Sequence, residues 1–69
     1  MRFHVEREVD QLWYPVGGGA IDANSPEQAV ARSADIAGTY RVAGIESGNG
    51  RPALFRVPLW GPPEPIEAR

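Results

Sequence analysis

The chain contains no cysteine and no lysine, and its 69 residues include one histidine and one methionine. Without cysteine, neither a disulfide, a thiolate metal site nor a thiol nucleophile can supplement a small core. No apolar run approaches the roughly 20 residues needed to span a bilayer. Met1 leads into a charged segment rather than a signal peptide. We therefore expect a cytoplasmic protein whose stability comes from packing.

Glycine and proline are abundant, with 8 and 7 residues, and 42% of the chain is hydrophobic. This composition is typical of a globular domain with short elements joined by many turns. The length suits one domain with a small core. A formal net charge of −2 argues against attraction of the whole molecule to nucleic acid or anionic lipid. Because every basic residue is arginine, which accompanies GC-rich coding, we expect a bacterial or phage origin.

The first segment, residues 2–9 (RFHVEREV), alternates between apolar and polar side chains with a period of two. This pattern predicts a half-buried strand. The apolar side carries Phe3, Val5 and Val9 and is interrupted by Arg7, whereas the polar side carries His4, Glu6 and Glu8. A turn at residues 10–11 follows.

Residues 12–16 (LWYPV) are bulky and apolar, but Pro15 excludes a central strand. We therefore place this segment at a sheet edge or in a loop. Residues 17–19 are three consecutive glycines without the lysine and hydroxyl residue of a phosphate loop. They predict a flexible connection or a bulge. Residues 20–23 then predict a second strand, antiparallel to the first.

The clearest local signal is the start of a helix at residues 24–28 (NSPEQ). Ser25 can cap the helix, Pro26 suits its first position, and Gln28 completes a capping box. The helix is expected to continue to residue 37 and to end at Gly38, acting as a C-terminal cap. Its buried face would consist of small side chains, together with Val30 and Ile36.

Two further strands are predicted at residues 39–46 and 51–60, joined by a hairpin turn at Gly48-Asn49. That turn pairs residue 42 with residue 55, and residue 40 with residue 57. It also places Arg41 and Arg56 opposite each other on the outer face. The core expected from all these elements is Phe3, Val5, Ile21, Val30, Ile36, Tyr40, Val42, Phe55 and Val57.

The C-terminal residues are too rich in proline for a helix or an inner strand. We predict an α+β domain with ββαββ order at residues 1–61. One helix packs on one face of its antiparallel sheet. Residues 62–69 would form an extended or flexible arm.

Catalytic, metal and cofactor sites are not predicted. His4 lacks neighbours with the spacing of metal ligands. Glu6 and Glu8 share a strand face, but catalytic carboxylate pairs need a cleft that desolvates one of them. The serines are better explained as cap, helix-surface and turn residues than as nucleophiles.

The paired arginines leave two interpretations open, because like charges directly across strands are destabilising unless an anion offsets them. Either Glu6 or Glu8 neutralises Arg41 and Arg56 within the domain, or a partner supplies carboxylates or nucleic-acid phosphates. The aromatic side chains of Trp13, Tyr14 and Trp60 are similarly ambiguous. They either fold over one end of the core or form an apolar patch that contacts another chain.

The leading hypothesis is a non-enzymatic protein-interaction module, an accessory subunit or a small regulator that forms a homodimer or a hetero-complex. Its expected partner-binding residues are Arg41, Arg56, Leu54, Trp60, Trp13 and Tyr14. The alternative is a nucleic-acid-binding protein that uses Arg41, Arg51 and Arg56 with a stacking aromatic. A third hypothesis is an oligomeric enzyme whose active site forms at the interface.

Overall fold

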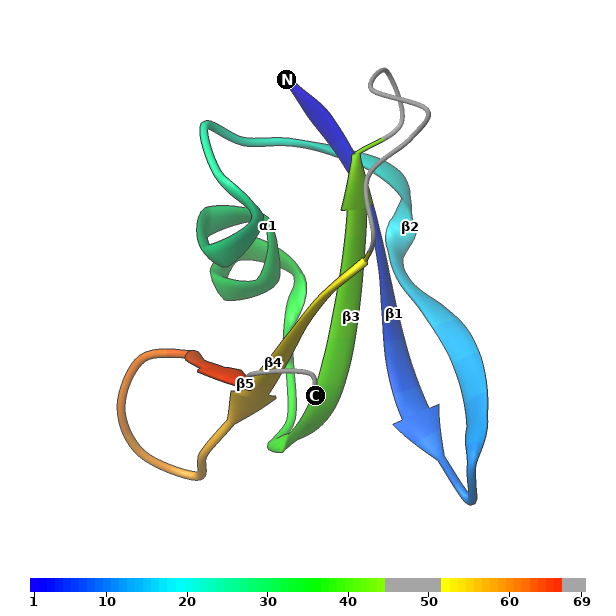
Figure 1. Cartoon of the computed structure of the whole chain (residues 1–69), viewed down its shortest axis with the longest axis vertical. Helices are drawn as coiled ribbons and strands as arrows, with labels where there is room; N and C mark the ends of the chain where they lie inside the picture. The colour runs from blue at the N-terminus through cyan, green and yellow to red at the C-terminus, as the bar shows by residue number, and fades with distance from the viewer. Residues whose placement is uncertain (45–51, 67–69) are drawn as a thin grey trace.

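A five-stranded antiparallel sheet carries helix α1 on one of its faces (Figure 1). The computed structural model describes residues 1–44 and 52–66. The strand order across the sheet is β2-β1-β3-β4-β5. The predicted ββαββ order is thus followed by one more short strand. The elements are β1 (Arg2–Val9), β2 (Leu12–Asp22), α1 (Pro26–Ser33), β3 (Gly38–Gly44), β4 (Ala53–Val57) and β5 (Glu64–Ile66).

The core lies between α1 and strands β1, β3 and β4. Its buried side chains are Phe3, Val5, Ala23, Ala29, Val30, Tyr40, Val42 and Phe55. Alanine on the helix allows it to approach the sheet closely. Ile21 and Val57 pack against this cluster while partly exposed. The prediction that Ile36 belongs to the core is wrong, because its side chain is 54% exposed.

The start of α1 confirms the predicted cap. Ser25 Oγ accepts a hydrogen bond from the backbone N–H of Gln28 at 3.1 Å. Gln28 Oε1 in turn accepts from the backbone N–H of Asn24 at 2.7 Å. Pro26 occupies the first turn, where its missing N–H leaves no hydrogen bond unmade.

The predicted end of the helix is wrong, because α1 stops at Ser33 and Ala34 is already extended. Gly38 is the first residue of β3 rather than a helix cap. Two contacts hold the intervening segment in its non-helical path. Asp35 pairs with Arg7 of β1 at 3.3 Å, and the Tyr40 hydroxyl donates to the Ile36 carbonyl oxygen at 2.7 Å. The first of these contacts links residues 28 apart in the chain, and the second links residues four apart.

The three glycines form a bulge in β2, which is an edge strand as predicted. Val16 pairs with Val5 and Ala20 pairs with His4, so residues 17–19 have no partner in β1. All three have positive φ, between 73° and 126°. A Cβ at Gly17 would lie 2.5 Å from Ile21 Cδ1 and 3.2 Å from Ser33 Cβ. Glycine therefore allows β2 to approach the end of α1.

The predicted pairing of β3 with β4 is wrong by two residues. Arg41 pairs with Leu54, Thr39 with Arg56, and Tyr40 with Phe55. A shift of two preserves the face of every side chain, because strand side chains alternate with a period of two. The predicted core residues of both strands therefore still face α1. The turn predicted at Gly48-Asn49 lies outside the described residues.

The C-terminal segment contributes β5, which pairs antiparallel with β4. Pro65 lies opposite Phe55 in this edge strand, where a missing N–H is tolerated. The division into a domain at 1–61 and an arm at 62–69 stays a prediction. Within the described residues, α1 is too short to cross a membrane.

Candidate functional site

The sheet has a face turned away from α1, which we call the open face. The strand register places one row of side chains across it, from β2 to β5. This row consists of Pro15, Glu6, Arg41, Leu54 and Ile66. The next row contains Trp13 opposite Glu8, and Arg56 opposite Glu64. Four of the predicted partner-binding residues thus share this face: Trp13, Arg41, Leu54 and Arg56.

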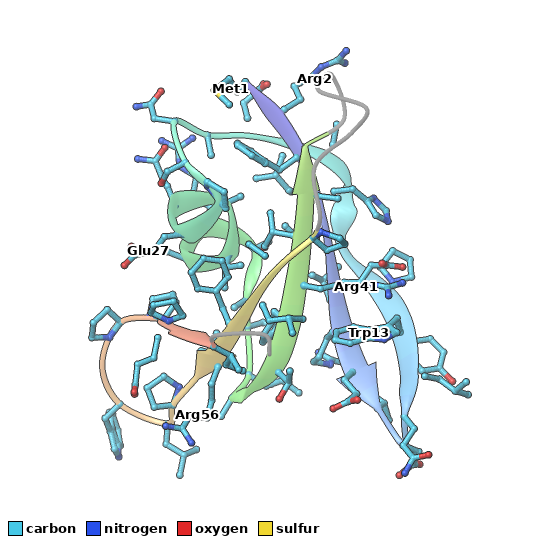
Figure 2. The ribbon with its side chains drawn as sticks, viewed as in Figure 1. Met1, Arg2, Trp13, Glu27, Arg41 and Arg56 are labelled. Carbon is cyan, nitrogen blue, oxygen red and sulfur yellow. The ribbon has the colours of Figure 1, made fainter. Side chains whose placement is uncertain are left out.

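Arg41 is held by two neighbours on the open face. Its Nε donates to Glu6 Oε1 at 2.6 Å, and its guanidinium carbon lies 4.5 Å from the centre of the Trp13 ring. Figure 2 shows Arg41 and Trp13 together over the β1–β2 side of the sheet, away from α1. The hydrogen bond and charge of Arg41 lower the pKa of Glu6, an effect that burial partly opposes. His4, 3.8 Å from Glu6, adds a smaller lowering effect on this pKa.

Arg56 lies apart from Arg41, at the β4–β5 end of the sheet (Figure 2). Its guanidinium is 3.5 Å from Glu64 Oε2, and both side chains are more than half exposed. The predicted opposition of Arg41 and Arg56 therefore does not exist. Glu6 pairs with Arg41, as the first interpretation required, whereas Arg56 pairs with Glu64, a carboxylate that this interpretation did not name. Arg51, the third arginine of the nucleic-acid hypothesis, lies outside the described residues.

The other two predicted binding residues lie elsewhere. Tyr14 pairs with Arg7, so its side chain lies on the sheet face that carries α1, and it is 46% exposed. Trp60 lies in the loop between β4 and β5 and is 90% exposed. Trp60 thus does not fold over the core. The structure separates the six predicted residues into three places, and their role in binding stays a prediction.

A groove on the α1 side of the sheet was not foreseen from the sequence. It has a volume of about 630 Å³ and lies between the end of α1 and the β4–β5 loop. One wall comes from residues 31–37, and the other from residues 57–63. The lining consists of Ala31, Ala34, Asp35, Ile36, Ala37, Val57, Pro58, Leu59, Gly61, Pro62 and Pro63. We call this the α1–loop groove.

Apolar side chains gather at the edge of this groove. Leu59 is 82% exposed and Trp60 is 90% exposed. The loop that carries them contains Pro58, Pro62 and Pro63, whose fixed φ angles limit its conformational freedom. In the sequence, the signal for this groove was therefore a Leu-Trp pair flanked by prolines. This pair does not predict the opposite wall of the groove, because the position of that wall depends on where α1 ends.

Asp35 brings a charge into the groove lining. Its Oδ1 lies 3.3 Å from Arg7 Nη1, and its side chain is 74% exposed. The Arg7 stem lies beside Gly38, and its Nε is buried without a hydrogen-bond partner. The Asp35 carboxylate thus has hydrogen-bonding capacity left for a ligand, while its charge is offset by Arg7.

Neither wall of the groove contains a group of side chains suited to a metal ion, and the rest of the described chain offers no cluster of three or more ligands. No protein-family model matches the sequence, and no curated protein or solved structure shows significant similarity to the chain.

Proposed function

We propose that the protein is a non-enzymatic protein-interaction module, an accessory subunit or small regulator that binds another chain through the α1–loop groove. The observation that supports this most is the exposed Leu59-Trp60 pair beside an apolar groove. Tryptophan is enriched among the residues that dominate binding energy in interfaces. A groove next to it provides the concave surface that such anchors need.

Burial of Trp60 against a partner would be favourable. An aromatic side chain buries about 150–250 Å², which at about 25 cal/mol per Å² corresponds to roughly 4–6 kcal/mol of transfer free energy. Association costs consume part of this gain. The loop prolines fix φ at positions 58, 62 and 63, which lowers the backbone part of the cost of ordering this loop on binding.

The open face is a weaker candidate. Its arginines are engaged with Glu6 and Glu64, so a partner would have to compete with existing ion pairs for them. Alternating charges of both signs are typical of a solvated sheet face. The groove differs, because its lining is largely apolar and a partner that covers it removes apolar surface from water.

Site-specific photo-crosslinking tests the proposal. A benzoylphenylalanine replaces Trp60, and the full chain is irradiated in an extract of its source cells. A control chain carries the crosslinker in place of Glu8, which is exposed on the open face. We expect a discrete protein adduct from position 60 and little from position 8. Equal labelling from both positions, or no protein adduct from position 60, would contradict the groove as the binding surface.

A further inference from the structure

We infer that the occupant of the α1–loop groove is a second copy of this chain, with each Trp60 inserted into the groove of the other copy. This inference rests on the proposed function and names its partner. It requires a two-fold symmetric contact in which the same surface is used by both subunits.

Trp60 lies beside the groove without lining it. Leu59 and Gly61, its two neighbours, line the groove, but Trp60 itself does not and remains 90% exposed. One loop thus supplies both a wall of the groove and an unused aromatic side chain. A two-fold axis beside this loop brings each Trp60 to the partner's groove while its own groove receives Trp60 of the partner subunit.

The size and chemistry of the groove suit an indole. Pockets of about 300–1,000 Å³ hold ligands larger than an indole, so a groove of about 630 Å³ has room for it. Alanine and proline on the walls present small apolar surfaces. A buried tryptophan also needs an acceptor for its ring N–H. The exposed Asp35 carboxylate, which lines the groove, provides one.

Charge does not oppose this contact. Among the described lining residues, Asp35 is the charged one, and Arg7 lies 3.3 Å from it. Two copies therefore meet through surfaces that are locally close to neutral. A two-fold contact between surfaces with uncompensated charge would instead place like charges together.

The area is compatible with a modest dimer. Two indoles and the groove surfaces that they cover account for roughly 800 Å². The Leu59 and Ile36 side chains belong to these groove surfaces, so the total stays below about 1,200 Å², the lower limit of a standard stable interface, and falls in the range of weak, transient contacts. A weak, reversible dimer with a dissociation constant of roughly 0.1–1 mM is the expected result.

Sedimentation of the purified chain over a concentration series tests the inference. We expect a reversible monomer–dimer equilibrium for the wild type, and at least a tenfold weaker dimer for Trp60→Ala. Leu12→Ala, which removes another exposed apolar side chain far from the groove, should dimerise like the wild type. In a Trp13→Phe background, Trp60 is the remaining indole, and its emission should shift to shorter wavelength as the dimer forms.

A mixing experiment tests directly whether Trp60 of one copy inserts into the groove of the other. Ala31→Trp fills the groove from an exposed helix position and leaves Trp60 in place, whereas Trp60→Ala leaves the groove open. Each variant alone should dimerise at least tenfold more weakly than the wild type. Their mixture should form a heterodimer that is weaker than the wild-type dimer but stronger than either variant alone, because one Trp60 can still enter one open groove. Circular dichroism establishes that both variants are folded.

A wild-type chain that stays monomeric up to millimolar concentration overturns the inference. So does a mixture of the two variants that associates no more strongly than either variant alone although the wild type dimerises. The proposed function fails separately, when position 60 crosslinks to no protein. A monomeric chain whose position 60 crosslinks to a different protein keeps the proposed function and excludes the second copy.

Discussion

Arg41 donates from its Nε to Glu6 Oε1 at 2.6 Å across the pairing of β1 with β3. The two residues are direct cross-strand neighbours, and Glu6 is 20% exposed. The contact therefore couples the stability of the sheet to the protonation state of one carboxylate.

Glu6→Gln should destabilise the protein by about 0.5–1 kcal/mol at pH 7. The pKa of Glu6 is lower in the folded chain than in the unfolded chain. Its contribution is thus complete above the unfolded pKa of about 4.3 and is lost as pH falls through the folded value. Urea unfolding between pH 7 and pH 3 should show the two chains converging in acid. Glu8→Gln, on the same face, should change stability by less than about 0.5 kcal/mol.

Arg41→Lys should weaken the open face although it keeps the charge. Lysine cannot stack a planar guanidinium on Trp13, and we expect a loss of about 0.5–1 kcal/mol. The measurement is a double-mutant cycle by chemical denaturation, with Trp13→Leu as the second change. Equal effects of Arg41→Lys in both backgrounds would show that the ring contact contributes nothing to stability.

Gly17→Ala and Gly18→Ala distinguish two contributions to stability at the glycine bulge: backbone strain at positive φ, and the steric clash of an added Cβ. Both positions have positive φ, at 77° and 73°, but a Cβ at Gly18 meets no atom within 4 Å. Gly18→Ala should therefore cost about 1 kcal/mol from backbone strain alone. Gly17→Ala should cost about 2 kcal/mol, because its Cβ also displaces Ile21 and approaches Ser33. Thermal melts of the two variants decide the order, and equal costs would show that Ile21 moves freely.

Ser25→Ala should lower the free energy of unfolding by about 1 kcal/mol, because the N–H of Gln28 loses its acceptor. Ser33→Ala is the matched control. Ser33 Oγ donates to the Ala29 carbonyl oxygen within the last turn, a contact that adds little to helix stability. A thermal melt in which Ser33→Ala costs more than Ser25→Ala would contradict the assignment of the cap.

The parts of the fold that were predictable from sequence depend on local chemistry. The Ser25-Pro26 cap, the alternation in β1 and the exclusion of Pro15 from a central strand each involve residues close in the chain. The end of α1 and the register of β3 with β4 depend on distant contacts. Gly38 resembled a helix cap, yet the helix ends at Ser33, and Asp35 instead pairs with Arg7, which is 28 residues away in the chain.

The candidate site shows the same division. The exposed Leu59-Trp60 pair is visible in the sequence, but its groove requires the helix to end at Ser33, so that residues 34–37 leave it and face the β4–β5 loop. Alternation predicted which face Arg41 and Arg56 occupy. It could not distinguish pairings that differ by two residues, since both leave every side chain on the same face. The expected clash of two arginines followed from that ambiguity.

The glycine bulge also bears on how this sheet meets other sheets. Three consecutive residues with positive φ interrupt the outer edge of β2, and the opposite edge is the three-residue β5 with Pro65 at its centre. Within residues 1–44 and 52–66, neither border offers a long, regular row of backbone donors and acceptors to a strand of another molecule. Such borders resist the edge-to-edge growth that leads to fibrils. Assembly of this protein should accordingly stop at closed, side-chain-mediated particles, and concentrated solutions should remain free of thioflavin-binding aggregates.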